Sequence, residues 1–80
     1  MTTTTTTAIR YATTDSDRWG ADGWFESRDH AVRAAMHAWD LTEEGAEEFV
    51  DETLTNIDPA EAPADLKATH GPDFVVYTRA

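Results

Sequence analysis

Residues 27–57 read SRDHAVRAAMHAWDLTEEGAEEFVDETLTNI and contain two successive helix signals. In the first signal, four apolar residues recur at i, i+3, i+4 and i+7, namely Val32, Ala35, Met36 and Trp39. This spacing places them in one stripe along a helix. Ser27 is a good N-cap, and Asp29 lies in the first turn, where a negative charge suits the helix dipole. The pattern predicts a helix over about residues 28–40.

A second helix signal follows a short break at residues 40–42. Thr42 can cap this helix, whose apolar residues recur at helical spacing: Ala46, Phe49, Val50, Leu54 and Ile57. Because the connection is so short, we expect the two helices to form a hairpin or an elbow with both apolar stripes facing one core.

Extended segments are predicted on both sides of the helical pair. Threonine, isoleucine and tyrosine favour strands, so a first strand is expected over about residues 5–13. A short second strand is expected at residues 24–26, after a loop rich in turn formers at residues 15–23. The β-branched and aromatic residues 74–78 predict a third strand.

The remaining segment, residues 58–72, holds all three prolines and is expected to be the main loop, with at most one helical turn at residues 64–69. The predicted fold class is therefore α+β, with two layers: a three-stranded sheet, in the order strand, strand, helix, helix, strand, packed on a helical hairpin. We expect the last strand to lie beside the first in a mixed sheet. Residues 1–80 then form a single acidic domain, with residues 1–4 frayed.

The charge balance is the outlying feature of the composition. The 80 residues include 16 Asp and Glu but only 6 Lys and Arg, which gives a net charge of -10 and a pI near 4.3. Such a field repels nucleic acid and anionic membranes and attracts cationic protein surfaces. We expect a basic protein surface as the partner, with no direct binding of nucleic acid or membrane. Simple solubility, as in halophilic proteins, is the alternative explanation.

The sequence lacks the patterns of the common catalytic and cofactor sites. Cysteine is absent, the glycines form no phosphate-binding loop, and neither Ser16 nor Ser27 lies in a nucleophile elbow. His30 and His37 are two helical turns apart, about 10.5 Å of rise, which suits a shared metal poorly. We therefore expect no catalytic residue, cofactor or metal. No apolar run of membrane-spanning length and no signal-peptide pattern is present, so a cytoplasmic location is expected.

Six acidic residues lie on the predicted second helix without an intervening base, and we call them the acidic face: Glu43, Glu44, Glu47, Glu48, Asp51 and Glu52. They form two rows at i, i+4 spacing, in which each like-charged pair costs an isolated helix a few tenths of a kcal/mol. The helix dipole stabilises only the first two. The remaining cost favours a binding function, although a merely solvated face stays open as an explanation.

A partner-binding site on this face needs no cofactor. Carboxylates spaced along a rigid helix can imitate the phosphates held by a basic nucleic-acid-binding cleft. Lys and Arg of the partner would pair with them, and an aromatic residue such as Trp19 or Trp24 could supply a buried anchor. Trp19 could instead be a lid over its own core, as is common for a tryptophan beside glycine.

With its acidic run from Glu43 to Glu52, short chain and compact α+β plan, the sequence resembles the small acidic anti-CRISPR proteins of phages and mobile elements, especially those directed at type I complexes. The resemblance implies an inhibitor that blocks DNA binding or nuclease recruitment by a CRISPR surveillance complex. The alternative is a non-catalytic regulatory or antitoxin-like interaction module that uses its helical hairpin or a sheet edge. Either would be a monomer or a weak homodimer.

Overall fold

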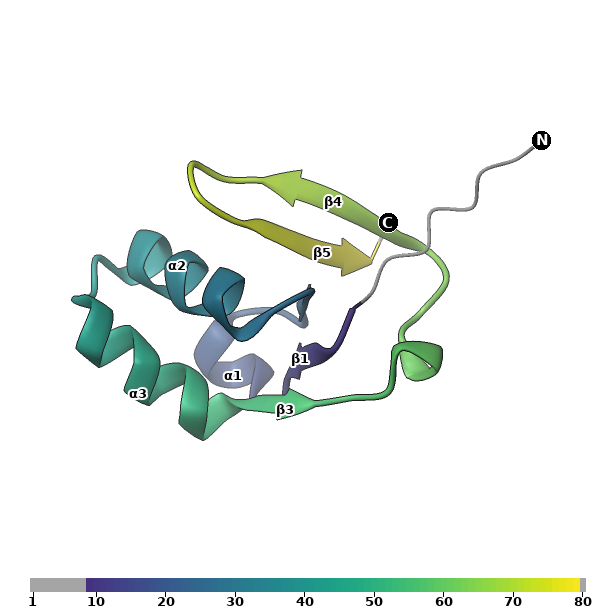
Figure 1. Cartoon of the computed structure of the whole chain (residues 1–80), viewed down its shortest axis with the longest axis horizontal. Coiled ribbons are helices and arrows are strands. Elements are labelled where there is room, and N and C mark those ends of the chain that lie inside the picture. The colour runs from purple at the N-terminus through teal and green to yellow at the C-terminus, as the bar shows by residue number, and fades with distance from the viewer. Residues whose placement is uncertain (1–8, 80) are drawn as a thin grey trace.

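The structure, a computed structural model, describes residues 9–79 and has an α+β fold (Figure 1). Its elements are, in order, β1 (Tyr11–Thr13), α1 (Ser16–Trp19), β2 (Trp24–Phe25), α2 (Arg28–Trp39), α3 (Glu43–Thr53), β3 (Leu54–Asn56), the 3-10 turn η1 (Pro59–Glu61), β4 (Leu66–His70) and β5 (Val75–Arg79). The predicted fraying of residues 1–4 and the first part of the predicted strand over residues 5–13 lie outside the described residues.

The helical hairpin is confirmed, and both predicted caps are formed. The Ser27 hydroxyl accepts a hydrogen bond from the N–H of His30 at 3.4 Å, and the Thr42 hydroxyl accepts one from the N–H of Gly45 at 3.1 Å. Between the helices, Asp40 takes a left-handed conformation with φ 55°, which reverses the chain within three residues. Helices α2 and α3 consequently lie side by side (Figure 1).

The core lies between this hairpin and the first two strands. Its fully buried apolar side chains come from Ile9, just before β1, and from β2, α2 and α3: Phe25, Ala31, Ala35, Ala46 and Val50. Alanine at these helix positions lets the two helix backbones approach closely, because a methyl group fills little space between them. None of the helices in residues 9–79 is long and apolar enough to cross a membrane.

Helix α3 is shorter than its apolar spacing predicted. It ends at Thr53, and residues 54–56 form β3, which pairs antiparallel with β1 in the register Thr13 to Leu54. Thr53 and Thr55 are β-branched and favour extended backbone, and β1 offers an unpaired edge at this point. The helical spacing of Leu54 and Ile57 therefore does not continue the helix.

Within residues 9–79 the sheet has five strands in the order β3-β1-β2-β5-β4, so the predicted count of three was wrong. Residues 66–70, expected in a loop or helical turn, form β4 and pair antiparallel with β5 from Leu66–Arg79 to His70–Val75. The four strand pairs in the described part of the chain are antiparallel, and β5 lies beside β2 rather than β1. The predicted mixed sheet was wrong because β3 already occupies the free edge of β1.

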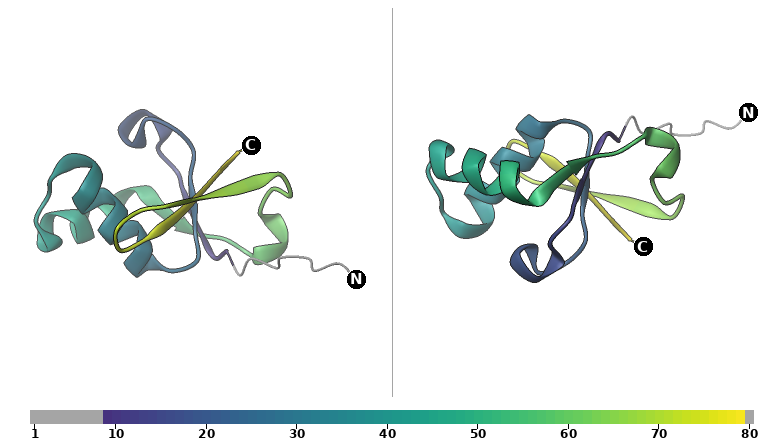
Figure 2. Two further views of the ribbon diagram at one scale, coloured as in Figure 1. Left: turned by 90° about the horizontal axis from the view of Figure 1, so that it is seen from above. Right: turned by 90° about the horizontal axis from the view of Figure 1, so that it is seen from below.

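The β4–β5 hairpin joins the remaining structure through β5, because Val76 and the preceding Phe74 pack against the core. Strands β2 and β5 share one pair, Trp24 with Tyr77, and Figure 2 shows the hairpin crossing the β1–β2 pair. The N–H of Val75 donates to Nδ1 of His30 on α2 at 2.9 Å, and the Tyr77 hydroxyl donates to the Glu26 carboxylate. Together with this packing, the two side-chain hydrogen bonds hold the hairpin against α2 and the end of β2.

Replacing His30 with Ala should loosen this attachment. The substitution leaves the partly buried N–H of Val75 without its acceptor, which should lower the free energy of unfolding by about 1–2 kcal/mol. Thermal denaturation should then show a midpoint lower by roughly 5–10 °C. His70→Thr, on the exposed strand β4, is the matched control and should change the midpoint little. Equal midpoints for H30A and wild type would contradict this role.

The Tyr77 hydroxyl should stabilise the protein at neutral pH and lose this effect at alkaline pH. Its hydrogen bond to Glu26, with partial burial, raises its pKa to about 12. A folded-state pKa above the ordinary value of about 10 means that the contribution is complete below pH 10 and is lost as pH rises through 12. The pair lies at the surface, so Tyr77→Phe should cost less than about 1 kcal/mol at neutral pH.

Chemical denaturation of both proteins between pH 8 and 12 measures this contribution. The stability difference between wild type and Y77F should shrink above about pH 10, because the tyrosine loses the proton that it donates. A difference that stays constant over the whole range would show that the hydroxyl adds nothing through this bond.

Candidate protein-binding surface

Helix α3 turns its acidic residues away from the core. Ala46, Val50 and Thr53 are buried on one side of the helix, while Glu44 and Glu48 are exposed on the opposite side. The outward direction of the acidic face follows from this packing, because residues four apart share one side of a helix.

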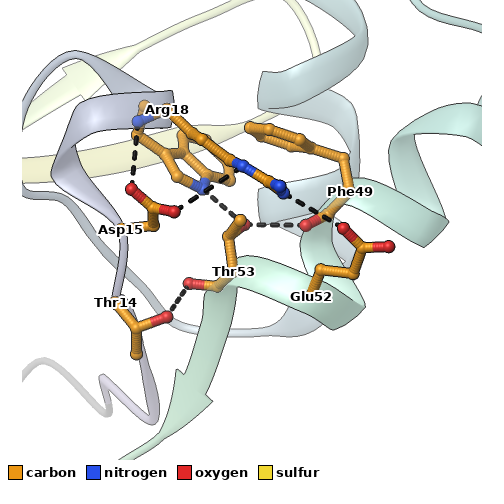
Figure 3. Close-up of polar contacts among 7 residues, drawn as sticks. Thr14, Asp15, Arg18, Phe49, Glu52 and Thr53 are labelled. Carbon is orange, nitrogen blue, oxygen red and sulfur yellow. Dashed lines mark hydrogen bonds and ion pairs between the residues drawn. The ribbon is translucent and has the colours of Figure 1, made fainter.

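The last turn of the acidic face is neutralised by arginines of the same chain, in contrast to the unbroken negative surface expected from sequence. Arg28, at the start of α2, lies 2.9 Å from a carboxylate oxygen of Asp51. Arg18 of α1 lies 3.0 Å from Glu52, and also 3.6 Å from Asp15, which caps α1 (Figure 3). Of the six predicted partner-binding acids, Asp51 and Glu52 are therefore already paired.

The other four acids, which we call the open half, are Glu43, Glu44, Glu47 and Glu48. None of them makes an ion pair within residues 9–79. Glu43 and Glu44 lie in the first turn of α3, where the helix dipole stabilises them. Glu47 is half-buried and Glu48 exposed, and neither makes an ion pair with another described residue. The uncompensated negative charge thus gathers at the N-terminal end of α3.

Trp19 packs within its own domain, as a lid over the core. Its ring centroid lies 5.6 Å from that of Phe25, 5.4 Å from Trp39 and 5.1 Å from Phe49. Its indole N–H donates to the Thr53 hydroxyl at 2.6 Å. Only part of the ring surface remains accessible to a partner.

Sequence reasoning passed over two features near the open half. Trp39 ends α2 with 40% of its surface exposed, a large exposed hydrophobic residue, and its ring packs edge-on against Trp19. A cleft of about 340 Å³ also lies between the C-terminal half of α2 and the turn that joins β4 to β5. The apolar spacing assigned Trp39 to the core, and no sequence signal placed the distant turn beside α2.

The described residues offer no cluster of three His, Asp or Glu side chains that could hold a metal ion. The two helical histidines have separate roles instead. His30 accepts the hydrogen bond from Val75, while the ring of His37 lies 5.7 Å from that of Phe74.

Comparison of the chain with protein-family models, with curated proteins and with solved structures finds no match.

Replacing a single glutamate by glutamine should change the free energy of unfolding in opposite directions in the two parts of the acidic face. Glu48→Gln removes repulsion from Glu44 and Glu52 at i±4 and should raise the free energy of unfolding by about 0.3–0.5 kcal/mol at low salt. Glu52→Gln has the same charge change but breaks the ion pair with Arg18, so it should destabilise the protein by up to about 1 kcal/mol. Urea denaturation measures both. A destabilising effect of E48Q would show that the open half carries no strain from like charges.

Proposed function

We propose that this chain is a non-catalytic, cytoplasmic inhibitor that binds a basic surface of a nucleic-acid-binding protein through the open half of the acidic face. The observation that carries the proposal is the uncompensated charge of Glu43, Glu44, Glu47 and Glu48 at one end of α3. A helix selected for stability alone would intersperse cations there, because like charges at i, i+4 repel each other.

The carboxylates act as substitutes for DNA phosphates. Lys and Arg of the partner pair with them and are no longer available to nucleic acid, so inhibitor and DNA compete. The net charge of -10 accelerates encounter with a basic surface at low salt. Trp39 lies next to the turn leading into α3, and its exposed ring surface provides an apolar contact beside the charged one.

More specifically, we propose that the chain is an anti-CRISPR protein. Its target is then a type I surveillance complex, which it prevents from binding DNA or from recruiting the nuclease. This form rests on the resemblance of the acidic run, the chain length and the α+β plan to those inhibitors.

A second candidate is a regulatory or antitoxin-like interaction module that binds through apolar or backbone contacts. Strand β4 favours it, because β4 is the last strand of the sheet and residues 67–70 are exposed. Such an edge can add a strand from a partner. Lys67 in this strand is the only lysine of the chain, and a charged lysine on an edge strand opposes unspecific strand addition. The acidic mode is therefore the better supported of the two.

Competition binding with a panel of purified DNA-binding proteins, including type I surveillance complexes, tests the proposal. The chain should displace duplex DNA from at least one of them, and its affinity should fall steeply as salt rises. Glu44→Lys with Glu48→Lys reverses two exposed charges and should weaken binding by at least about tenfold, since close charge pairs at interfaces contribute over 1 kcal/mol each.

The double variant Glu61→Lys with Asp65→Lys is the matched control. It makes the same change in net charge in the segment between β3 and β4, where both residues are exposed. It should retain most of the affinity if position matters and not only total charge. Equal losses in both double variants, or an affinity insensitive to salt, would rule out the open half as the binding site and favour the β4 edge.

A further inference from the structure

The cleft between α2 and the β4–β5 turn lies at the same end of the molecule as the open half. Met36, Leu41 and Phe74 supply its apolar lining, and Asp40 and Asp73 contribute a carboxylate from each side. Its volume of about 340 Å³ is at the small end of the range for ligand sites, which suits a single long side chain.

The aromatic wall of the cleft is held in place by the turn. A Cβ atom at Gly71 would lie 2.2 Å from the Phe74 ring, so only glycine permits the ring to fold back over the turn. The N–H of Gly71 donates to the carbonyl of Phe74 at 2.8 Å, and the His37 ring lies 5.7 Å from the Phe74 ring on the helix side. Glycine at position 71 thus leaves room for the Phe74 ring at the cleft, where it lies beside His37.

The charges around the cleft favour a cation. Arg33 also lines the cleft, but its guanidinium is already paired with carboxylates of this chain. Asp29 lies 3.2 Å from the guanidinium and raises the pKa of Arg33, and Asp73 lies 4.0 Å from it. Asp40 makes no ion pair in the described part of the chain. Glu43 adds a further negative charge from the start of α3. Carboxylates therefore outnumber cations at the cleft, and the net charge of -10 opposes any anion there.

Asp40 is an unfavourable residue for the fold itself. It occupies a left-handed position where glycine is the usual residue, and it places a negative charge at the C-terminal, negative end of the α2 dipole. Binding a cation would offset this cost.

We infer that the cleft binds an arginine side chain of the partner, between the carboxylates of Asp40 and Asp73 and against the ring of Phe74. The inference rests on the proposed function and names the residue type that the partner inserts beside the open half. A planar guanidinium can stack on an aromatic ring and hydrogen-bond to two carboxylates at once, which a lysine ammonium does less well.

Two capped tripeptides, Gly-Arg-Gly and Gly-Lys-Gly, test the inference by nuclear magnetic resonance titration of the full chain. The arginine peptide should shift the signals of Met36, Leu41 and Phe74 and bind roughly fivefold more tightly than the lysine peptide. Asp40→Asn with Asp73→Asn should weaken arginine binding by roughly fivefold or more. Asp40→Asn alone is the conservative variant, because asparagine tolerates the left-handed conformation, and its amide spectrum checks that the fold is retained.

The E44K/E48K variant separates this inference from the proposed function. It should bind the arginine tripeptide at the cleft as before, while losing affinity for the basic partner. Equal binding of the two tripeptides, shifts outside the cleft, or unchanged binding by a folded D40N/D73N variant would each overturn the arginine site, whatever happens at the open half. Arginine binding at the cleft, with full partner affinity in E44K/E48K, would instead overturn the proposed function alone.

Discussion

The buried hydroxyl of Thr53 is the contact on which the arrangement of this protein depends. It accepts a hydrogen bond from the indole N–H of Trp19 at 2.6 Å. It donates one to the carbonyl of Phe49 at 2.7 Å (Figure 3). The carbonyl of the same residue accepts the N–H of Thr14 at 2.7 Å. One residue, 1% exposed, therefore ties α1 and the end of β1 to α3, at the point where the helix becomes β3.

This attachment also determines where the negative charge remains uncompensated. When Trp19 docks against α3, the preceding Arg18 comes within reach of Glu52, and the antiparallel hairpin brings Arg28 of α2 to Asp51. At the other end of the hairpin, the last turn of α2 carries no arginine or lysine. The nearest one, Arg33, is engaged by Asp29. The open half, the exposed Trp39 and the cleft consequently lie together at the end of the molecule where α2 meets α3.

The helices could be predicted from sequence because their determinants are local. Ser27 and Thr42 are caps whose hydrogen bonds reach only three residues ahead, and the apolar spacing of each helix needs no distant partner. The strands β3 and β4 could not be predicted in this way. Segment 66–70 contains little that favours a strand, and it is ordered by pairing with the strongly β-forming segment 75–79.

In the candidate site, too, the features set by local spacing could be predicted from sequence, and those set by tertiary packing could not. The acidic face follows from helical spacing alone, whereas its two ion pairs join residues 23 and 34 positions apart and depend on tertiary packing. The alternatives for Trp19 could not be separated before its contact with Thr53 was known. The cleft depends on the position of the β4–β5 turn against α2, about which the sequence is silent.

The most direct test of the central claim is amide chemical-shift mapping of the isotope-labelled chain on addition of a nona-arginine peptide at about 0.15 M salt, where the screening length is about 8 Å. The account predicts the largest changes in residues 40–48, which contain the open half and Asp40. Changes concentrated instead in residues 58–65, where Asp58, Glu61 and Asp65 lie, would contradict it. They would show that the uncompensated charge of α3 does not form the preferred site for a basic surface.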